Sequence, residues 1–559
     1  MKKWWKELVA YQVYLKSFKD SNDDGIGDIR GLISKLDYLA DLGIGLIWLS
    51  PMYESPNDDN GYDISDYYQI LKDYGTMKDF DDLLANCHER NIKLIIDLVI
   101  NHTSDEHPWF LESKDDKLNA KRDYYIWREP VNNKEPNNWE SIFKGSAWEY
   151  NENTKDYYLH LFSKKQPDLN WENEHMRRDI YHMIRWWLDK GIDGFRVDAI
   201  SHIKKEPCFK DLPNPKKLDY VPSFDSHMNV EGIHAYLGEL KSQTYGQYDV
   251  VTVGEANGVS ADNIEDLKSW IGEEEGAFDM VFQFDHLGLW DRADKEAFDL
   301  VKFKKALSKW QYNLEGIGWN ALYIENHDQP RVVSIWGDEG LRKESAKAFA
   351  MTYFLQKGTP FIYQGQEIGM TNPAYDDLAD YEDCGTQNEY RDALEQGWDH
   401  DQAMAVIKLT SRVNSRSPMQ WNADLYGGFS KVHPWAKINP NYPLVNVELE
   451  SQDSDSILNF YKKLIQIRNQ SETLIYGEYK LLMPRHSAIY AYERQGGDEK
   501  YLMIANLISE DTAFKFPYSL KQAELCLSNY DINESIKSRS MLFRPYECRL
   551  YKITQVIPK

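Results

Sequence analysis

The chain has 559 residues, with 65 Lys and Arg against 90 Asp and Glu, and its formal charge at pH 7 is −25. That charge argues against nucleic acid and against anionic membrane surfaces as partners, because both carry negative charge themselves. The length exceeds one ordinary domain, and it fits a barrel that carries an insertion and an appended domain.

The first predicted elements are strands separated by a helical segment. Residues 12–18 (Q-V-Y-L-K-S-F) and 45–50 (G-L-I-W-L-S) are rich in β-branched, aromatic and aliphatic side chains, which favours strands. Between them, apolar residues recur at helical spacing: Leu32, Leu36, Leu39 and Ala40. A third apolar strand ends at His102.

The strand and helix alternation then stops over residues 103–172, which indicates an inserted unit, since a long loop inside a compact domain is usually functional. It resumes with a helix whose apolar face is predicted from spacing: Ile180, Met183, Ile184, Trp187 and Leu188. Later strands are predicted at 278–284 and 359–365, and a final helix at 457–468. Beyond residue 471, short runs such as 489–492 and 501–507 predict antiparallel strands.

Strands that alternate with helices predict a parallel sheet covered on both faces. The predicted fold class is α/β: a (β/α)8 TIM barrel from residues 1–102 and 173–470, with an inserted domain at 103–172. Residues 471–559 are predicted to form a C-terminal antiparallel β-sandwich.

Several of the predicted barrel strands end in acids or histidines. Asp198 ends a strand on which Arg196 points to the same face, and a cation beside a carboxylate keeps it ionised, as a nucleophile must be. Glu255 and Asp328 close two other strands. The carboxyl ends of barrel strands converge, so these three carboxyls should meet, which fits glycoside hydrolysis. Taken alone, the Arg196 and Asp198 pair is better interpreted as a structural ion pair, and the other strand ends shift the interpretation toward a nucleophile.

Four sequence blocks carry a family resemblance: D-L-V-I-N-H (97–102), G-F-R-V-D-A (194–199), V-G-E-A (253–256) and E-N-H-D (325–328). They resemble the four signature regions of the α-amylase family, glycoside hydrolase family 13. A fifth block, Q-P-D-L-N-W (166–171), resembles the signature of its oligo-1,6-glucosidase and α-glucosidase subfamily.

The resemblance implies a role for each catalytic carboxyl. Asp198 corresponds to the nucleophile, Glu255 to the acid/base, and Asp328 to a third carboxylate that hydrogen-bonds the reacting sugar. His102 and His327 match histidines that contact the same sugar. In the family the segment 103–172 is domain B, which leans over the active site.

The block D-D-N-G-Y-D (58–63) is a turn signal through its Asn-Gly pair. The resemblance implies that it also closes the −1 subsite, with Tyr62 stacked on glucose and Asp63 paired with Arg416. A closed pocket implies release of one terminal glucose at a time. Phe162 and Gln166 fall in the block that supplies contacts on the aglycone side.

The segment D-S-N-D-D-G-I-G-D (20–28) places oxygen donors at alternating positions, with Gly25 at the sharp turn. It departs from a full EF-hand because its twelfth position is Gly31 rather than Glu, and a plain polar turn is the alternative. The subfamily resemblance implies a structural Ca²⁺ or Mg²⁺ held by this loop and no organic cofactor. The implied ligands are Asp20, Asn22, Asp24, the Ile26 carbonyl and Asp28.

The predicted activity is that of a retaining exo-acting α-glucosidase on short oligosaccharides. Ala199 and Asn257 resemble the residues of subfamily members that prefer α-1,4 bonds, which predicts maltose and maltooligosaccharides as substrates. Both should border the +1 sugar, where one or two methyl groups shift discrimination by roughly 1–3 kcal/mol. The alternative is an oligo-1,6-glucosidase or dextran glucosidase acting on isomaltose and isomaltooligosaccharides, or a transglucosylating relative.

Other functions fit the sequence less well. Amino-acid transporter heavy chains resemble this fold, but they carry a membrane anchor and lack the full carboxylate set. Sucrose isomerases have an arginine-rich motif where this chain has R-V-V-S (331–334), and nothing plainly marks the phosphate pocket of a trehalose-6-phosphate hydrolase. No membrane-spanning run or secretory signal is visible, and five scattered cysteines fit a reducing compartment, so a cytoplasmic monomer is expected.

Overall fold

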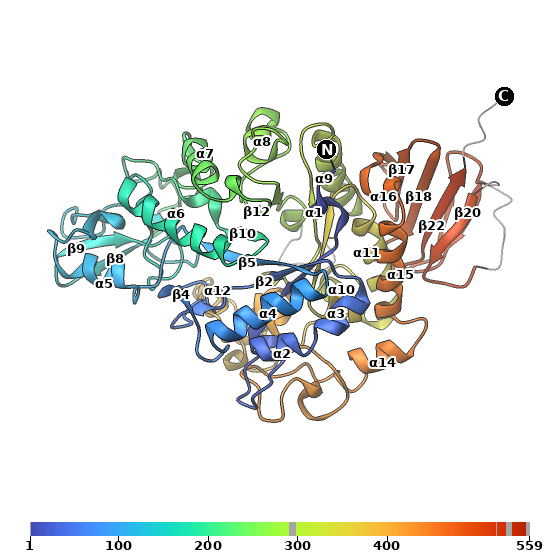
Figure 1. The fold of residues 1–559 in the computed structure, drawn as a ribbon, viewed down its shortest axis with the longest axis horizontal. Coiled ribbons are helices and arrows are strands. Elements are labelled where there is room, and N and C mark those ends of the chain that lie inside the picture. Colours follow the sequence, from blue (N-terminus) through green and yellow to red (C-terminus); the bar gives the residue numbers. More distant parts are fainter. Residues whose placement is uncertain (1, 290–297, 521–522, 533–538, 555–559) are drawn as a thin grey trace.

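The computed structural model describes residues 2–289, 298–520, 523–532 and 539–554. Its centre is a barrel of eight parallel strands in the order β13-β12-β10-β5-β2-β1-β15-β14 (Figure 1). The strands are β1 (Ala10–Val13), β2 (Leu46–Leu49), β5 (Lys93–Val99), β10 (Gly194–Asp198), β12 (Val251–Glu255), β13 (Met280–Phe282), β14 (Ala321–Leu322) and β15 (Thr359–Tyr363). The Tyr323 hydroxyl, just past β14, donates to the Gln283 carbonyl, just past β13, at 2.6 Å. The predicted TIM barrel is therefore confirmed.

Helices cover the outside of the barrel, because each strand buries both faces and returns through a helical connection. They are α1 (Trp4–Glu7), α2 (Ile29–Ile33), α3 (Leu36–Leu42), α4 (Met77–Glu89), α6 (Glu174–Asp189), α7 (Ile233–Gln243), α8 (Ile264–Ile271), α9 (Leu300–Asn313), α10 (Val332–Ile335), α11 (Arg342–Phe354) and α15 (Ile457–Asn469). The face predicted for α6 is confirmed, since all five of its named apolar residues are buried. Asn173 caps this helix by accepting from the Met176 amide.

Two early predictions need correction. The helix expected around Leu32–Ala40 is two helices, α2 and α3, interrupted at residues 34 and 35, and Ala40 is exposed because it lies on the outer side of α3. The first strand begins and ends earlier than predicted, and residues 15–17 form a 3-10 turn that redirects the chain toward the loop at 20–28.

The inserted domain extends from one end of the molecule (left in Figure 1) and contains a three-stranded antiparallel sheet. Its elements are α5 (Pro108–Asp115), β6 (Trp127–Arg128), β7 (Trp139–Glu140), β8 (Trp148–Asn151) and β9 (Asp156–Leu159). Strand β7 pairs with β11 (Val221–Pro222), and Phe209 packs into the core of the domain with Trp139 and Trp148. Phe209 and strand β11 come after residue 172, the predicted end of the inserted domain, but they pack with this domain.

Several elements lie outside this simple alternation. A short antiparallel pair, β3 (Tyr53–Glu54) and β4 (Asp66–Ile70), flanks the turn at 58–63. The long segment after β15 carries α12 (Cys384–Glu395), α13 (His400–Thr410) and α14 (Val447–Gln452). It leads back to the barrel at α15.

The C-terminal unit follows α16 (Glu472–Tyr476) and is antiparallel, as predicted. Its five-stranded sheet contains β16 (Glu478–Leu482), β17 (Ile489–Gly496), β18 (Glu499–Asn506), β22 (Cys548–Thr554) and β20 (Ala523–Ser528). Strands β19 (Thr512–Lys515) and β21 (Ser540–Phe543) form a second sheet that shares an apolar core with the first. The other face packs on the barrel, where the Tyr492 hydroxyl donates to the Thr352 carbonyl at 3.0 Å.

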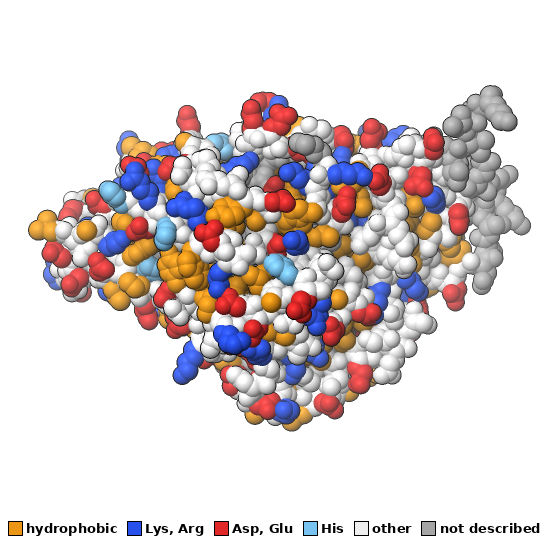
Figure 2. Space-filling model, in the orientation of Figure 1, with side chains coloured by type: hydrophobic (Ala, Val, Ile, Leu, Met, Phe, Trp, Pro, Cys, Tyr) orange, Lys and Arg blue, Asp and Glu red, His pale blue; other side chains and the backbone are white. Residues whose placement is uncertain are grey.

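Charged groups of both signs are mixed over the face shown in Figure 2, so the acidic excess is not gathered into one region there. None of the described helices is long and apolar enough to cross a membrane.

Candidate active site

The three predicted catalytic carboxyls lie at the same end of the barrel. Asp198 is the last residue of β10 and Glu255 the last of β12, while Asp328 lies six residues beyond the end of β14. Parallel strands bring their carboxyl ends to one face, so residues far apart in the chain meet there.

Arg196 is the centre of the first cluster. Its Nη1 donates to Asp198 Oδ1 and to Asp97 Oδ1, both at 2.7 Å, and its Nη2 lies 2.9 Å from Glu255 Oε2. The predicted Arg196 and Asp198 pair is confirmed, and Asp97 joins it as a fully buried third acid. One guanidinium therefore serves three carboxyls.

Burial and mutual repulsion change the protonation of this cluster. Burial raises the pKa of Asp97 to about 6, although Arg196 opposes the shift. Burial also raises the pKa of Asp198 well above its ordinary value, and the charges of Glu255 and Asp97 add to the shift. Arg196 opposes the shift without cancelling it, so the expectation that the cation alone keeps Asp198 ionised needs correction. The cluster consequently retains a proton more readily than three isolated carboxyls would.

Ala199 links the nucleophile to the acid. It adopts φ +42°, a left-handed conformation that is uncommon for residues other than glycine. In this conformation its backbone amide donates to Glu255 Oε2 at 2.9 Å. Oε2 of Glu255 thus receives two donors, the Ala199 amide and Arg196.

Asp328 belongs to a second cluster of opposite character. It accepts from Arg416 Nη2 at 2.7 Å and from Arg412 Nη1 at 3.3 Å, and its Oδ2 lies 3.1 Å from His327 Nε2. Burial alone would raise its pKa, but His327 and the two arginines outweigh that effect and hold the pKa well below its ordinary value. Asp328 is therefore ionised across the neutral range.

The predicted pairing of Asp63 with Arg416 is wrong. Asp63 accepts from Ser55 Oγ at 3.0 Å and from the backbone amides of residues 58 and 59, at 2.8 and 3.0 Å. The acid that reaches across the cleft is Asp59, which accepts from Arg412 Nη2 at 2.9 Å. The Asn-Gly turn, with positive φ at both residues, folds the block so that Asp63 accepts from the backbone of the turn while the buried Asp59 faces Arg412.

The other predicted sugar-contacting residues are joined in one network. The Tyr62 ring stacks on His327 with centroids 5.4 Å apart, and the Phe162 ring lies 5.1 Å from that of His102. Gln166 Nε2 lies 3.1 Å from both His102 Nε2 and Asp59 Oδ2. The structure brings these side chains to the cleft, and their contacts with sugar stay predictions.

Some residues of the site carried no separate signal in the sequence. Arg412 binds Asp383 as well as Asp59 and Asp328, and it lies under the Phe143 ring at 5.1 Å. The buried Lys205 ammonium joins Asp168 Oδ2, at 2.6 Å, to Asn101 Oδ1, at 2.8 Å. Only Asp168 and Asn101 lay in recognisable blocks, because lysines and arginines in loops have no diagnostic spacing.

Asn257 lies in the turn directly after β12 and is half-buried. The next residue, Gly258, is so close to the Met228 side chain that an added Cβ would meet it at 2.9 Å. This places Asn257 near the end of the barrel that holds Glu255, and its contact with a +1 sugar stays a prediction.

The loop at 20–28 is held by hydrogen bonds to its own amides. Asp20 accepts from the amides of Asn22, Asp23 and Gly25, while Asp28 accepts from Ser21 and caps α2 at Gly31. Within the described part of the chain, no three His, Cys, Asp or Glu side chains gather as a metal site. The loop oxygens are hard donors of the kind that Ca²⁺ and Mg²⁺ prefer, and a site formed by Asp20, Asn22, Asp24, Ile26 and Asp28 stays a prediction.

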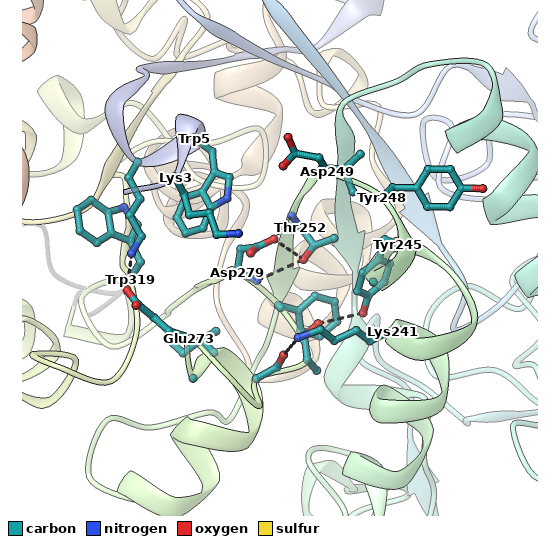
Figure 3. A pocket seen from close by; sticks show the side chains of 18 residues that line it. Lys3, Trp5, Lys241, Tyr245, Tyr248, Asp249, Thr252, Glu273, Asp279 and Trp319 are labelled. Carbon is teal, nitrogen blue, oxygen red and sulfur yellow. Dashed lines mark hydrogen bonds and ion pairs between the residues drawn. The ribbon is translucent and has the colours of Figure 1, made fainter. Parts of the chain in front are cut away.

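A hollow of about 190 Å³ lies at the opposite, amino-terminal end of the barrel strands (Figure 3). Its polar groups largely satisfy one another: Lys6 pairs with Glu273, Lys241 donates to the Gly276 carbonyl, and Asp279 accepts from Thr252. None of the three catalytic carboxyls lines it. The three carboxyls lie instead at the carboxyl ends of the strands.

Comparison with known proteins agrees with this geometry. Residues 12–477 match the family model described as "Alpha amylase, catalytic domain". The chain is 54% identical to "Probable oligo-1,6-glucosidase 3" of Bacillus subtilis (strain 168), over 98% of this chain and 99% of that one. It is 50% identical to "Oligo-1,6-glucosidase" of Bacillus cereus, over 99% and 100%. Among solved structures, isomaltulose synthase from Klebsiella sp. LX3 superposes with a TM-score of 0.94, at 43% identity and 99% coverage of both chains.

The chain belongs to the alpha-amylase family, and it is a glycoside hydrolase of the α-glucosidase type. The subfamily expected from the sequence is confirmed. The two relatives are named as oligo-1,6-glucosidases, whereas Ala199 and Asn257 predict an α-1,4 preference.

Proposed function

We propose that the protein is a retaining exo-acting α-glucosidase that hydrolyses terminal α-1,6 bonds of isomaltose and isomaltooligosaccharides. The observation that carries the hydrolase chemistry is the convergence of Asp198 and Glu255 on Arg196 at one end of the barrel. The α-1,6 preference is supported by the two relatives named oligo-1,6-glucosidase.

The hydrogen bonds around Glu255 define its part in the reaction. Both donors in reach, the Ala199 amide and Arg196 Nη2, bind Oε2, so the transferable proton belongs on Oε1. Glu255 gives that proton to the leaving oxygen as Asp198 Oδ2 attacks the anomeric carbon. Arg196 holds Asp198 Oδ1, which leaves Oδ2 for the attack. Water deprotonated by Glu255 then releases glucose with the α configuration retained.

The second cluster supports the exo mode of action. Asp59, Arg412, Asp328 and Arg416 form a continuous chain of ion pairs beside Tyr62 and His327. Such a chain of fixed donors and acceptors suits the hydroxyls of one terminal glucose, which supports release of one glucose at a time. Asp328, ionised and 30% exposed, is the member that a sugar reaches most easily.

A second candidate is an α-1,4-glucosidase, and the small side chain of Ala199 favours it. Ala199 lies between Asp198 and the 3-10 turn at 200–202, with its amide on Glu255. A valine there would add two methyl groups beside the leaving sugar. Because one or two methyl groups are worth roughly 1–3 kcal/mol in a pocket, the two linkages differ in rate without being exclusive.

The deciding experiment compares kcat/KM for isomaltose and maltose on the unaltered enzyme, with the released anomer followed by NMR. A higher value on isomaltose is expected, and a clear maltose preference would establish the second candidate. Ala199→Val should raise the isomaltose-to-maltose ratio. Ala374→Val is the matched control for backbone strain, because Ala374 also has a positive φ, of +49°, at an exposed position.

A further inference from the structure

Three aromatic rings pack against the His327 ring. The Tyr62 ring is nearly parallel to it, with ring centroids 5.4 Å apart and an interplanar angle of 8°, and the Tyr14 ring lies at 6.1 Å and 20°. The Trp48 ring meets it edge-on at 5.8 Å. His327 is 1% exposed, so its two nitrogens have fixed neighbours and only the position of the proton is free to vary.

The neighbours of Nε2 require a hydrogen on that atom. Asp328 Oδ2 lies 3.1 Å away, and an ionised carboxylate can only accept. The Tyr62 hydroxyl lies 2.7 Å from Nε2 and 3.1 Å from Asp97 Oδ2. Tyr62 therefore gives its hydrogen to Asp97 and accepts from His327.

The other nitrogen, Nδ1, faces Gln12. Gln12 lies on β1 inside the barrel, is 1% exposed, and places Nε2 at 2.7 Å from Nδ1 of His327. Burial lowers the pKa of His327 to about 3, and Arg416, Arg412 and Arg196 add to the effect while Asp328 opposes it. The ring is thus neutral at working pH, and with its one hydrogen on Nε2 it presents a lone pair to the Gln12 amide.

We propose that Gln12 is a positioning residue: by donating to Nδ1 it fixes His327 as the Nε2–H tautomer, so that a directed chain of hydrogen bonds runs from Gln12 through His327 and Tyr62 to Asp97. The chain ends on the acid that shares Arg196 with the nucleophile Asp198. Gln12 thereby keeps the one Nε2 hydrogen between the Tyr62 hydroxyl, at 2.7 Å, and Asp328 Oδ2, at 3.1 Å, next to the sugar that Asp328 would bind. The part that concerns sugar rests on the proposed function, whereas the tautomer does not.

The direction of this chain of hydrogen bonds predicts the effects of two substitutions at Gln12. Gln12→Met keeps the length of the side chain but removes the donor, which leaves Nδ1 buried without a partner. Gln12→Glu keeps the shape but puts a carboxylate at Nδ1, which requires a hydrogen there, so the ring either reverses its tautomer or becomes cationic. In the cationic case the ring titrates at a higher pH than in the unaltered protein.

The direct test is the ¹⁵N NMR spectrum of His327 in the full chain, assigned by comparison with His327→Gln. In the unaltered protein Nε2 should show the protonated, pyrrole-type shift and Nδ1 the unprotonated type. Gln12→Glu should move Nδ1 to the protonated type, and Gln12→Met should give a mixture of tautomers. A wild-type spectrum with hydrogen on Nδ1 would overturn the proposal, whatever sugar the enzyme prefers.

Kinetics separate positioning from simple loss of stability. Gln12→Met should lower kcat/KM by about 10- to 100-fold, the cost of one unsatisfied buried group. Gln356→Met is the matched control, because Gln356 is equally buried but bonds Thr352 and Tyr490 away from the cleft. If both variants lose the same activity, or if Gln12→Met leaves the His327 spectrum unchanged, the positioning role is excluded. If Gln12→Met does not fold, the isosteric Gln12→Glu carries both measurements.

Discussion

The two halves of the cleft differ in how many acids share each arginine. Around Arg196, three carboxyls (Asp97, Asp198 and Glu255) share one guanidinium. Around Arg412 and Arg416, three carboxyls (Asp59, Asp328 and Asp383) share two. For the same number of carboxyls, the cluster around Arg412 and Arg416 therefore has one positive charge more than the cluster around Arg196.

Protonation follows that balance. In the first half burial prevails, and the pKa values of Asp97 and Asp198 are raised. In the second half the arginines prevail at two acids: the pKa of Asp328 falls well below its ordinary value, and that of Asp383 falls to about 2. Asp59 is the exception, because burial raises its pKa even beside Arg412. The lesson is that one half handles protons, while the other supplies fixed charge for binding.

The largest expected effect comes from the half that handles protons. Asp198→Asn removes the attacking oxygen but keeps the shape and one contact with Arg196. We expect a folded protein whose turnover falls by at least roughly three orders of magnitude, because the covalent step is lost. Turnover on p-nitrophenyl α-glucoside measures it, with circular dichroism as the check on folding. A rate near that of the unaltered enzyme would contradict the nucleophile assignment.

A substitution in the binding half should act mainly on KM. Arg412→Met leaves Asp59, Asp328 and Asp383 with one arginine fewer, and breaking a buried ion pair costs roughly 3–5 kcal/mol. We expect kcat/KM to fall by about 100- to 1,000-fold, with KM rising more than kcat falls. Arg128→Met, an exposed arginine of the inserted domain, is the control. An equal loss in both variants would show that net charge, rather than the ion-pair chain, matters.

The pH dependence of kcat/KM should reflect protonation of the cluster around Arg196 and not of the cluster around Arg412 and Arg416. As pH falls, the cluster around Arg196 takes up a proton first, since the pKa of Asp97 is about 6, and protonated Asp198 cannot attack. Log kcat/KM should therefore decline with a slope near one at a pH above the ordinary carboxyl range, where Asp198 takes up its proton. Asp328 remains ionised there because its pKa is lowered. A log kcat/KM that begins to decline only below pH 4 would contradict the difference in protonation between the two clusters.

The smallest effect concerns stability. The pKa of Asp383 is lowered to about 2 by Arg412 and Arg416 against the effect of burial, so its ionised form stabilises the folded state above its ordinary pKa. That contribution, about 2 kcal/mol, is lost as pH falls from about 4 to 2. Asp383→Asn should lower the free energy of unfolding by about this amount at pH 7, and less at pH 3. Thermal unfolding at both pH values measures it, and an equal loss at both would contradict the ionic origin.

Much of the fold could be predicted from the sequence because barrel strands are short apolar runs with distinct ends. The runs ending at Asp198 and Glu255 are each continuous in the chain, and their polar last residues mark the functional end. The five signature blocks fixed the family for the same reason, since each is a local pattern. The helix boundaries at residues 34 and 35 were missed because nothing in the apolar spacing marks the break between α2 and α3.

Tertiary structure alone decided the pairings across the cleft. Asp59 and Asp63 are both acids of one turn, and only the positive φ at Asn60 and Gly61 determines which of them reaches Arg412. Likewise, no spacing relates Gln12 to His327, because the contact joins strands at opposite ends of the barrel sequence and forms only when the barrel closes. Sequence thus determined which residue types end each strand. The closed barrel determined their partners, and through those partners their charge.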